Sequence, residues 1–138
     1  MSWDIFVQEL PENARSISEI HDDFRPGIIG ERGRIIEAIL RVVPEADFSE
    51  PSWGLIEREG FSIEVNLGQD EQVSSFAFHV RGGGKAVELI DALLNSLGMR
   101  AIDSSTGDIF SIDAATRSFR EWQAYRDGVS SAGNSGSQ

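Results

Sequence analysis

Several stretches of the chain alternate between apolar and polar residues. In FSIEVNL, residues 61–67, every second residue from Phe61 to Leu67 is apolar, and SSFAFHVR, residues 74–81, has the same pattern. A period of two is that of a β-strand with one buried face, so both stretches predict such strands. Shorter forms of the pattern predict further strands at residues 3–8, 52–59, 99–103 and 108–112.

Two other stretches carry apolar residues at the spacing of an α-helix. The first, residues 33–43, ends before Pro44, and the second, residues 85–97, ends before Gly98. Proline and glycine are frequent helix terminators, so these bounds predict two amphipathic helices. Their apolar stripes consist of Ile35, Ile36, Ile39, Leu40 and Val43 in the first helix and of Ala86, Val87, Ile90, Leu93, Leu94 and Leu97 in the second.

The order of these elements predicts an α+β fold, a mostly antiparallel sheet with two helices packed on one face. Residues 10–30 lack a sustained period and predict a long ordered loop with a helical turn near Ile17 and Ile20. Trp3 and Trp53 stand at the starts of predicted strands, and we expect both to help close the core.

The end of the chain predicts a C-terminal helical appendage over residues 113–127. Its aromatic stripe, Phe119, Trp122 and Tyr125, either docks on the body of the domain, which we favour, or meets another chain. Residues 1–127 should therefore form a single α+β domain. The small polar residues 128–138 have almost nothing to bury, so we expect a disordered tail there.

Charge is the strongest signal in the composition. The 138 residues include 12 basic and 23 acidic ones, a net charge of −11, and residues 1–71 alone carry −10. Such a field repels nucleic acid and anionic membranes and favours a basic protein as partner. The alternative is that the charge serves solubility alone and contacts no specific partner. The sequence does not determine the oligomeric state.

The residue types in the chain also argue against disulfides, bound metals, a secretion signal and a membrane span. With no cysteine and two histidines, we expect no disulfide, metal site or cofactor. The first residues have no basic region followed by an apolar run, and no stretch approaches the length of a membrane span. These features predict a soluble cytoplasmic protein.

The glycine triplet at residues 82–84 has to be tested as a phosphate-binding loop. Lys85 is followed by Ala86 instead of the Ser or Thr that a Walker-type loop needs, and the triplet lacks the spacing of a dinucleotide fingerprint. We interpret it as a sharp strand-to-helix turn. The alternative is a looser anion site at the start of the helix, between Arg81 and Lys85.

Alternation also places polar side chains on the sheet face away from the helices. Glu64, His79 and Arg81 should share this face, with Ser62 or Gly60 opposite His79 and Glu64 diagonal to it. If the first strand joins the same sheet, Asp4, Phe6 and Gln8 extend the patch. Carboxylate, imidazole and guanidinium could bind a small ligand or serve acid–base chemistry, although such pairs often occur on solvated sheets without any chemistry. Because no nucleophile accompanies them, we assign no catalytic residue.

A second set of candidates lies in the proline-bounded loop between residues 44 and 51. Glu45, Asp47 and Glu50 concentrate negative charge there. We expect these side chains to contact a basic partner, and we expect the loop itself to bury little.

The stretches WDIFVQ, FSIEVN, SFAFHVRGG and LGMRAID resemble a group of small acidic bacterial proteins over roughly residues 2–110. This resemblance implies neither an activity nor a site residue. The size, acidity and layered build are also similar to those of immunity proteins, which neutralise toxins by covering them; fold-level likeness does not establish function.

Two hypotheses follow. The first is a non-enzymatic acidic protein-binding module, of which an immunity protein is one form. The second is a small-ligand binder or hydrolase that uses Glu64, His79 and Arg81. A deep pocket around His79 would favour the second, and a flat acidic surface the first.

Overall fold

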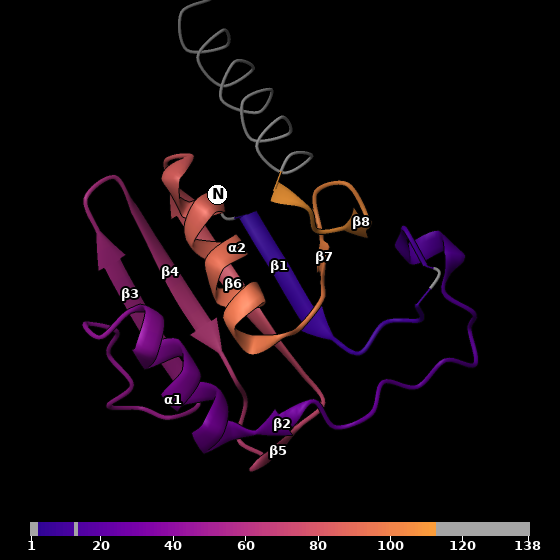
Figure 1. Ribbon diagram of the computed structural model, residues 1–138, viewed down its shortest axis with the longest axis horizontal. Coiled ribbons are helices and arrows are strands. Elements are labelled where there is room, and N and C mark those ends of the chain that lie inside the picture. The colour runs from indigo at the N-terminus through magenta and orange to yellow at the C-terminus, as the bar shows by residue number, and fades with distance from the viewer. Residues whose placement is uncertain (1–2, 13, 113–138) are drawn as a thin grey trace, which may run out of the picture.

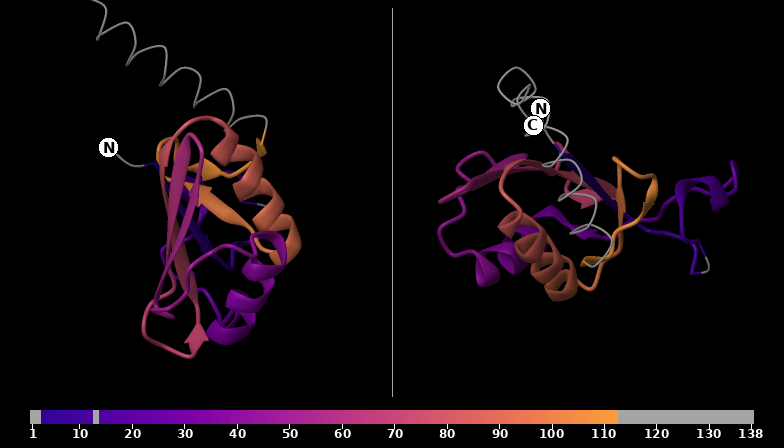
Figure 2. Two further views of the ribbon diagram at one scale, coloured as in Figure 1. Left: turned by 90° about the vertical axis from the view of Figure 1, so that its left-hand side faces the viewer. Right: turned by 90° about the horizontal axis from the view of Figure 1, so that it is seen from above.

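The computed structural model describes residues 3–12 and 14–112. They form a six-stranded antiparallel sheet in the order β3-β4-β6-β1-β7-β8, and Figures 1 and 2 show both α-helices on the same side of it. The strands of this sheet are β1 (Trp3–Gln8), β3 (Trp53–Arg58), β4 (Phe61–Asn66), β6 (Ser75–Gly82), β7 (Ala101–Asp103) and β8 (Asp108–Ile109). The helices are α1 (Arg32–Val42) and α2 (Lys85–Leu97). The predicted α+β class is confirmed.

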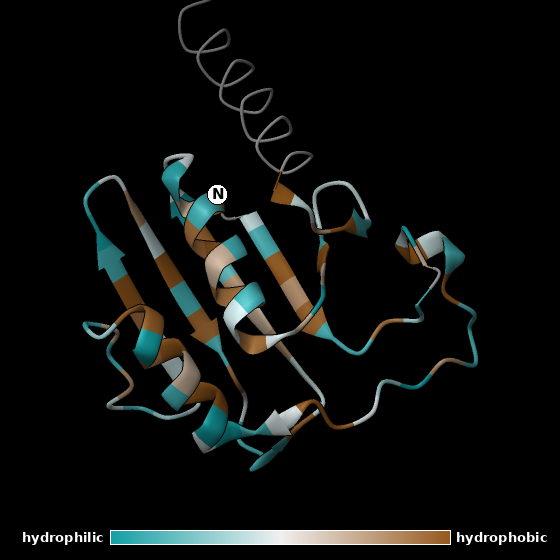
Figure 3. Cartoon of the chain, viewed as in Figure 1, coloured by the Kyte–Doolittle hydropathy of each residue, from teal (hydrophilic) through white to brown (hydrophobic). Residues whose placement is uncertain are grey.

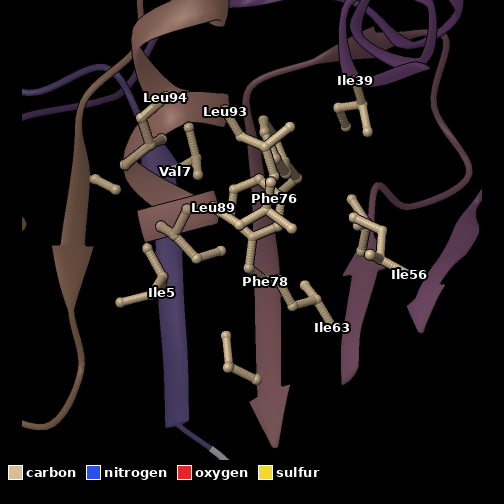
Figure 4. Close-up of a cluster of buried hydrophobic side chains, with 14 of the residues drawn as sticks. Ile5, Val7, Ile39, Ile56, Ile63, Phe76, Phe78, Leu89, Leu93 and Leu94 are labelled. Atoms are coloured by element: carbon tan, nitrogen blue, oxygen red, sulfur yellow. The ribbon is translucent and has the colours of Figure 1, made fainter. Parts of the chain in front are cut away.

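The predicted alternation fixes which face of each strand is buried. Along β4, buried and half-buried residues alternate without interruption, which Figure 3 shows as bands of contrasting hydropathy. On β6, Phe76, Phe78 and Val80 face the helices, as expected. Phe78 is fully buried, and Figure 4 shows it between side chains of α2 and the neighbouring strands.

Both predicted helices are present. The bounds of α2 agree with the prediction, and Gly98 ends this helix in the left-handed conformation, with φ of 66°. A glycine adopts that conformation without the steric penalty of a side chain. Helix α1 begins and ends one residue earlier than expected, so that Val43 is its C-cap instead of its last residue.

The predicted register between β4 and β6, with Ser62 or Gly60 opposite His79, is wrong by two or four residues. Glu64 lies directly opposite His79, and Ser62 lies opposite Arg81. The connection between these strands contains β5 (Gln72–Val73), which pairs with β2 (Gly30–Glu31). The connection is therefore no tight hairpin turn. Because the shift is by an even number of residues, every side chain keeps its predicted face.

The long loop before α1 is ordered by contacts with the other end of the domain. It contains the 3₁₀ helix η1 (Ile17–Glu19), where a helical turn was predicted. Arg100 donates hydrogen bonds to the carbonyl oxygens of Pro11 and Ala14, at 3.0 and 3.2 Å. The Ile17 amide donates to the carbonyl of Gly107 at 2.7 Å.

Two predictions lie outside the described residues, namely the helical appendage at 113–127 and the polar tail at 128–138. Within residues 3–12 and 14–112, no helix has the length and apolar character needed to cross a membrane.

Candidate binding surface on the open face of the sheet

The sheet face opposite the helices is called the open face here. No described helix lies over it (Figure 2). Strand pairing sets Trp53 beside Asn66, Asn66 beside Ala77 and Ala77 beside Phe6, all on this face. The remaining side chains that the register of the six strands places on it are those of Leu55, Glu57, Ser62, Glu64, Ser75, His79, Arg81, Asp4, Gln8, Ile102 and Ile109.

His79 lies at the centre of the open face, between Glu64 on β4 and Asp4 on β1. The imidazole Nδ1 is 2.8 Å from Asp4 Oδ1. An ionised carboxylate only accepts, so the imidazole donates this bond. The ring also stacks on Trp53, with 5.8 Å between centroids and 22° between planes. Both contacts fix the position of the imidazole.

Arg81 pairs with Glu64 diagonally across β6 and β4, because Ser62 is the residue directly opposite Arg81. Its Nη1 donates to Glu64 Oε1 at 3.1 Å. The structure thus brings Glu64, His79 and Arg81 together on one face, as the alternation predicts, and adds Asp4 from the other end of the sequence. Among residues 3–12 and 14–112, Asp4 is the one hydrogen-bond partner of the imidazole, and no serine or threonine hydroxyl forms a hydrogen bond with it.

Trp53 was expected in the core, and this expectation is wrong. Its side chain lies on the open face and is 41% exposed, as is that of Phe6. The alternation on β3 contained the signal: Gly54 and Ile56 are buried against the helices, so Trp53 must point the other way. Trp3, by contrast, packs against the core as expected, and its indole nitrogen donates to Asp103 Oδ1 at 2.8 Å.

Asp47 extends the open face beyond the edge strand. Its backbone forms a two-way bridge with Leu55, with hydrogen bonds of 2.8 and 2.9 Å, so the two side chains share a face. The next residue, Phe48, lies on the helix side with its ring against Gly54. Hydrogen bonds from the hydroxyl and amide of Ser49 hold the pKa of the Asp47 carboxyl below its ordinary value.

Glu45 and Glu50 lie elsewhere, so the loop carboxylates do not form one patch. Glu45 accepts a hydrogen bond from Arg58 Nε at 2.9 Å, which lowers the pKa of its carboxyl. Glu50 accepts from Ser52 Oγ at 2.7 Å, and this bond lowers its pKa in the same way. The loop also buries more than expected, because Ala46 and Phe48 pack on the core.

The glycine triplet makes a close crossing of two backbone segments. Gly82 has φ of 109°, and a Cβ at this position would meet the carbonyl oxygen of Gly60. That oxygen also accepts a hydrogen bond from the Gly83 amide at 2.7 Å. The amides of Ala86 and Val87 donate to the carbonyls of Gly83 and Gly84, at 3.2 and 3.1 Å. This geometry supports the interpretation as a strand-to-helix turn.

Two hollows in the surface of the described residues lie away from His79. One groove of about 590 Å³ lies on the helix side of the sheet. It is lined by Glu45, Arg58, Glu59, Phe61, Lys85, Glu88, Leu89 and Ala92. A smaller one follows the outer surface of α1. In the part of the chain that the structure describes, no group of three or more acidic or histidine side chains is placed to hold a metal ion.

Comparison of the chain with models of known protein families, with curated proteins and with solved structures gives no match.

Proposed function

We propose that the protein is a non-enzymatic binding module that takes a basic protein segment on the open face of its sheet. The observation that carries this proposal is the pair Trp53 and Phe6, both 41% exposed on a face that also carries an excess of carboxylates. Two large aromatic side chains thus lie on this face and not in the core. Binding interfaces use such residues as anchors because one aromatic side chain removes a large apolar area from water.

The charge of the open face selects the partner. Asp4, Asp47, Glu57 and Glu64 lie on it against one guanidinium, that of Arg81, a formal charge of −3. Arginine side chains fit this surface well, since a guanidinium stacks on an indole and pairs with carboxylates at the same time. The surrounding negative field would also speed the encounter with a basic partner.

The surroundings of His79 favour binding over hydrolysis. Its Nδ1 is occupied by Asp4, and its ring lies against Trp53, so the imidazole is part of a fixed surface. Hydrolysis by covalent catalysis would require a nucleophile within hydrogen-bond reach of this base, and none of the described hydroxyl groups is.

A small-ligand site remains the second candidate, favoured by one observation. The Asp4–His79 pair has the arrangement in which a carboxylate orients an imidazole. A planar ligand could lie beside the Trp53–His79 stack. His79→Ala would abolish this binding, whereas it would weaken capture of a basic protein only moderately.

The proposal is tested by affinity capture from the source cells with immobilised full-length protein. The double variant Trp53→Ala, Phe6→Ala should lose the partner that the wild type retains. Ile17→Ala, Ile28→Ala is the matched control, because these two exposed apolar side chains lie in the long loop, off the face. The proposal fails if both double variants retain the partner equally, or if the partner is acidic.

A further inference from the structure

We infer that the segment bound on the open face is a basic, amphipathic α-helix of the partner that lies across the strands. This inference rests on the proposed function, since it takes the open face as the binding surface, and it specifies the conformation and direction of the bound segment. It follows from the order in which the strand register places aromatic and acidic side chains on that face.

The two exposed aromatic residues of the open face stand at the ends of one row that crosses the strands. In this row, called the aromatic row, Trp53 lies beside Asn66, Asn66 beside Ala77 and Ala77 beside Phe6. Three spacings of about 4.8 Å separate β3 from β1, so the aromatic residues are roughly 14 Å apart (Figure 1). A segment that contacts both of them must therefore run across the strands and not along one of them.

An acidic row runs beside the aromatic row, two residues away along each strand. In the order of the strands it consists of Asp47, Leu55, Glu64, His79 and Asp4. A carboxylate occupies every second position, so the carboxylates recur at intervals of about 10 Å, twice the strand spacing. The open face thus offers aromatic contact along one line and negative charge along a parallel line.

Two of the three carboxylates in the acidic row have an oxygen available to a partner. Asp47 accepts both hydrogen bonds from Ser49 on Oδ1, and Glu64 accepts from Arg81 on Oε1. Within the part of the chain that the structure describes, Asp47 Oδ2 and Glu64 Oε2 accept no hydrogen bond. An ionised carboxylate binds a guanidinium or ammonium group through such an oxygen. The acidic row therefore has acceptors for at least two basic side chains.

The spacings of the two rows match those of an amphipathic helix. Positions i, i+3 and i+7 on one side of a helix cover about 10 Å, which fits between the aromatic side chains. Basic residues seven positions apart follow each other at about 10.5 Å, close to the interval between the carboxylates. An extended segment presents the same side every 6.6 Å or about that, which does not match the carboxylates. The rows are also about 6.6 Å apart, so one helix of about 10 Å diameter covers both.

An extended partner would instead add a strand at an edge of the sheet, and the chain itself occupies both edges. Along β3, the Trp53 amide donates to the carbonyl of Glu50, and Leu55 exchanges two hydrogen bonds with Asp47. Along β8, the Ile109 amide donates to the carbonyl of Arg15. The backbone groups that a strand would need are therefore already paired at these positions, whereas the open face is uncovered by any described helix.

The test uses the full-length protein and two synthetic peptides of roughly 14 residues made of leucine, arginine and alanine, a length of about 21 Å as a helix. The first has leucine at every third or fourth position and arginine along one flank. The second has the same composition, with leucine alternating with the other residues. In NMR titrations the first should bind about tenfold more tightly, with shifts in β1, β3, β4 and β6. Equal affinities, or shifts confined to α1 and α2, would overturn the inference.

The direction of the helix is tested with a nitroxide on a cysteine at one end of the first peptide. The protein has no cysteine that would react with the label. A label at one end should broaden the signals of β3 more strongly than those of β1, and a label at the other end should do the reverse. If the two labels instead broaden opposite ends of the same strands, the helix lies along them and the inference is wrong.

The acidic row is tested by the double variant Asp47→Asn, Glu64→Gln. Affinity for the first peptide should fall about tenfold, and its dependence on salt should become weaker. Glu37→Gln, Glu88→Gln is the matched control, because it removes the same charge from α1 and α2. Equal losses in the two double variants would mean that the net charge attracts the peptide and that the acidic row does not position it.

Failure of this inference is distinguishable from failure of the proposed function. If the second peptide binds the open face as tightly as the first, the helix is excluded, while the loss of the cellular partner in Trp53→Ala, Phe6→Ala still stands. If that double variant retains the cellular partner, the proposed function fails whatever the peptides do. A shift of the open-face signals with the concentration of the protein alone would place a second copy there and would also overturn the inference.

Discussion

The two faces of the sheet are made by the same strands and differ in almost every physical property. Neighbours in sequence illustrate the contrast: Phe78 is fully buried against the helices, while His79 lies on the open face between Asp4 and Trp53. On the helix face, apolar burial supplies the stability of the fold. On the open face, hydrogen bonds and ring stacking fix side chains that the core does not need. We infer that one face maintains the structure and the other is available for recognition.

The sharpest test of this contrast is Phe78→Ala. Phe78 packs edge-on against Phe76 with 5.3 Å between ring centroids, and its removal leaves a cavity in the core. We expect a loss of about 3–5 kcal/mol in the free energy of unfolding, measured by urea denaturation. A loss below that of the open-face variants would contradict the assignment of the helix face as the source of stability.

A substitution in the turn between β6 and α2 should cause the next largest loss of stability. Gly82→Ala introduces a Cβ at positive φ and against the Gly60 carbonyl, so β6 and the turn to α2 must shift. We expect a loss of roughly 1–3 kcal/mol in thermal or urea unfolding. Gly33→Ala is the control, because Gly33 lies in α1 with open space around it and alanine favours a helix. Equal effects at the two glycines would remove the argument for a close backbone crossing.

On the open face, His79→Ala should cost much less than Phe78→Ala. It removes the bond to Asp4 and the contact with Trp53, both of them partly exposed. We expect a loss of about 1 kcal/mol in unfolding free energy, together with a change in tryptophan emission as the imidazole leaves the indole. A loss as large as that of Phe78→Ala would mean that the open face holds the fold together.

The smallest expected effect is a loss of stability at acidic pH. It tests the loop of residues 44–51, which lies at the edge of the two faces. Hydrogen bonds hold the pKa values of Glu45, Asp47 and Glu50 below their ordinary values of 4.5, 3.8 and 4.5. A lowered pKa in the folded state means that the stabilisation is present above the ordinary value and is lost as the pH falls through the folded one. Unfolding free energy should therefore decrease below about pH 4.5.

Asp47→Asn and Ser49→Ala should each flatten this pH dependence, because the first removes the titrating group and the second removes a donor to it. The comparison is made by urea denaturation between pH 3 and pH 6, the range around the ordinary carboxyl values. An unchanged slope in both variants would mean that Asp47 contributes nothing to acid stability.

Local patterns in the sequence were sufficient to predict both α-helices and the strands of the six-stranded sheet, whereas the short strands β2 and β5 were not predicted. The alternation from Phe61 to Leu67 and the stripe in residues 85–97 report which side chains meet the core, since strand and helix have fixed periods. The same alternation places Trp53 on the open face, whereas the general preference of tryptophan for buried positions predicts the core, and on β3 the alternation holds.

Tertiary structure alone decided which side chains meet. Asp4 and His79 are 75 residues apart, and they bond because β1 inserts between β6 and β7. Glu64 stands opposite His79 in a register that the alternation of the two strands left open, and the connection between them pairs with β2, which no local pattern in the strands encodes. Glu45 and Asp47 are two residues apart, yet they lie on different faces, because Arg58 holds one and the bridge to Leu55 holds the other. Periodicity sets the face of a residue, whereas its neighbours depend on pairings between segments distant in sequence.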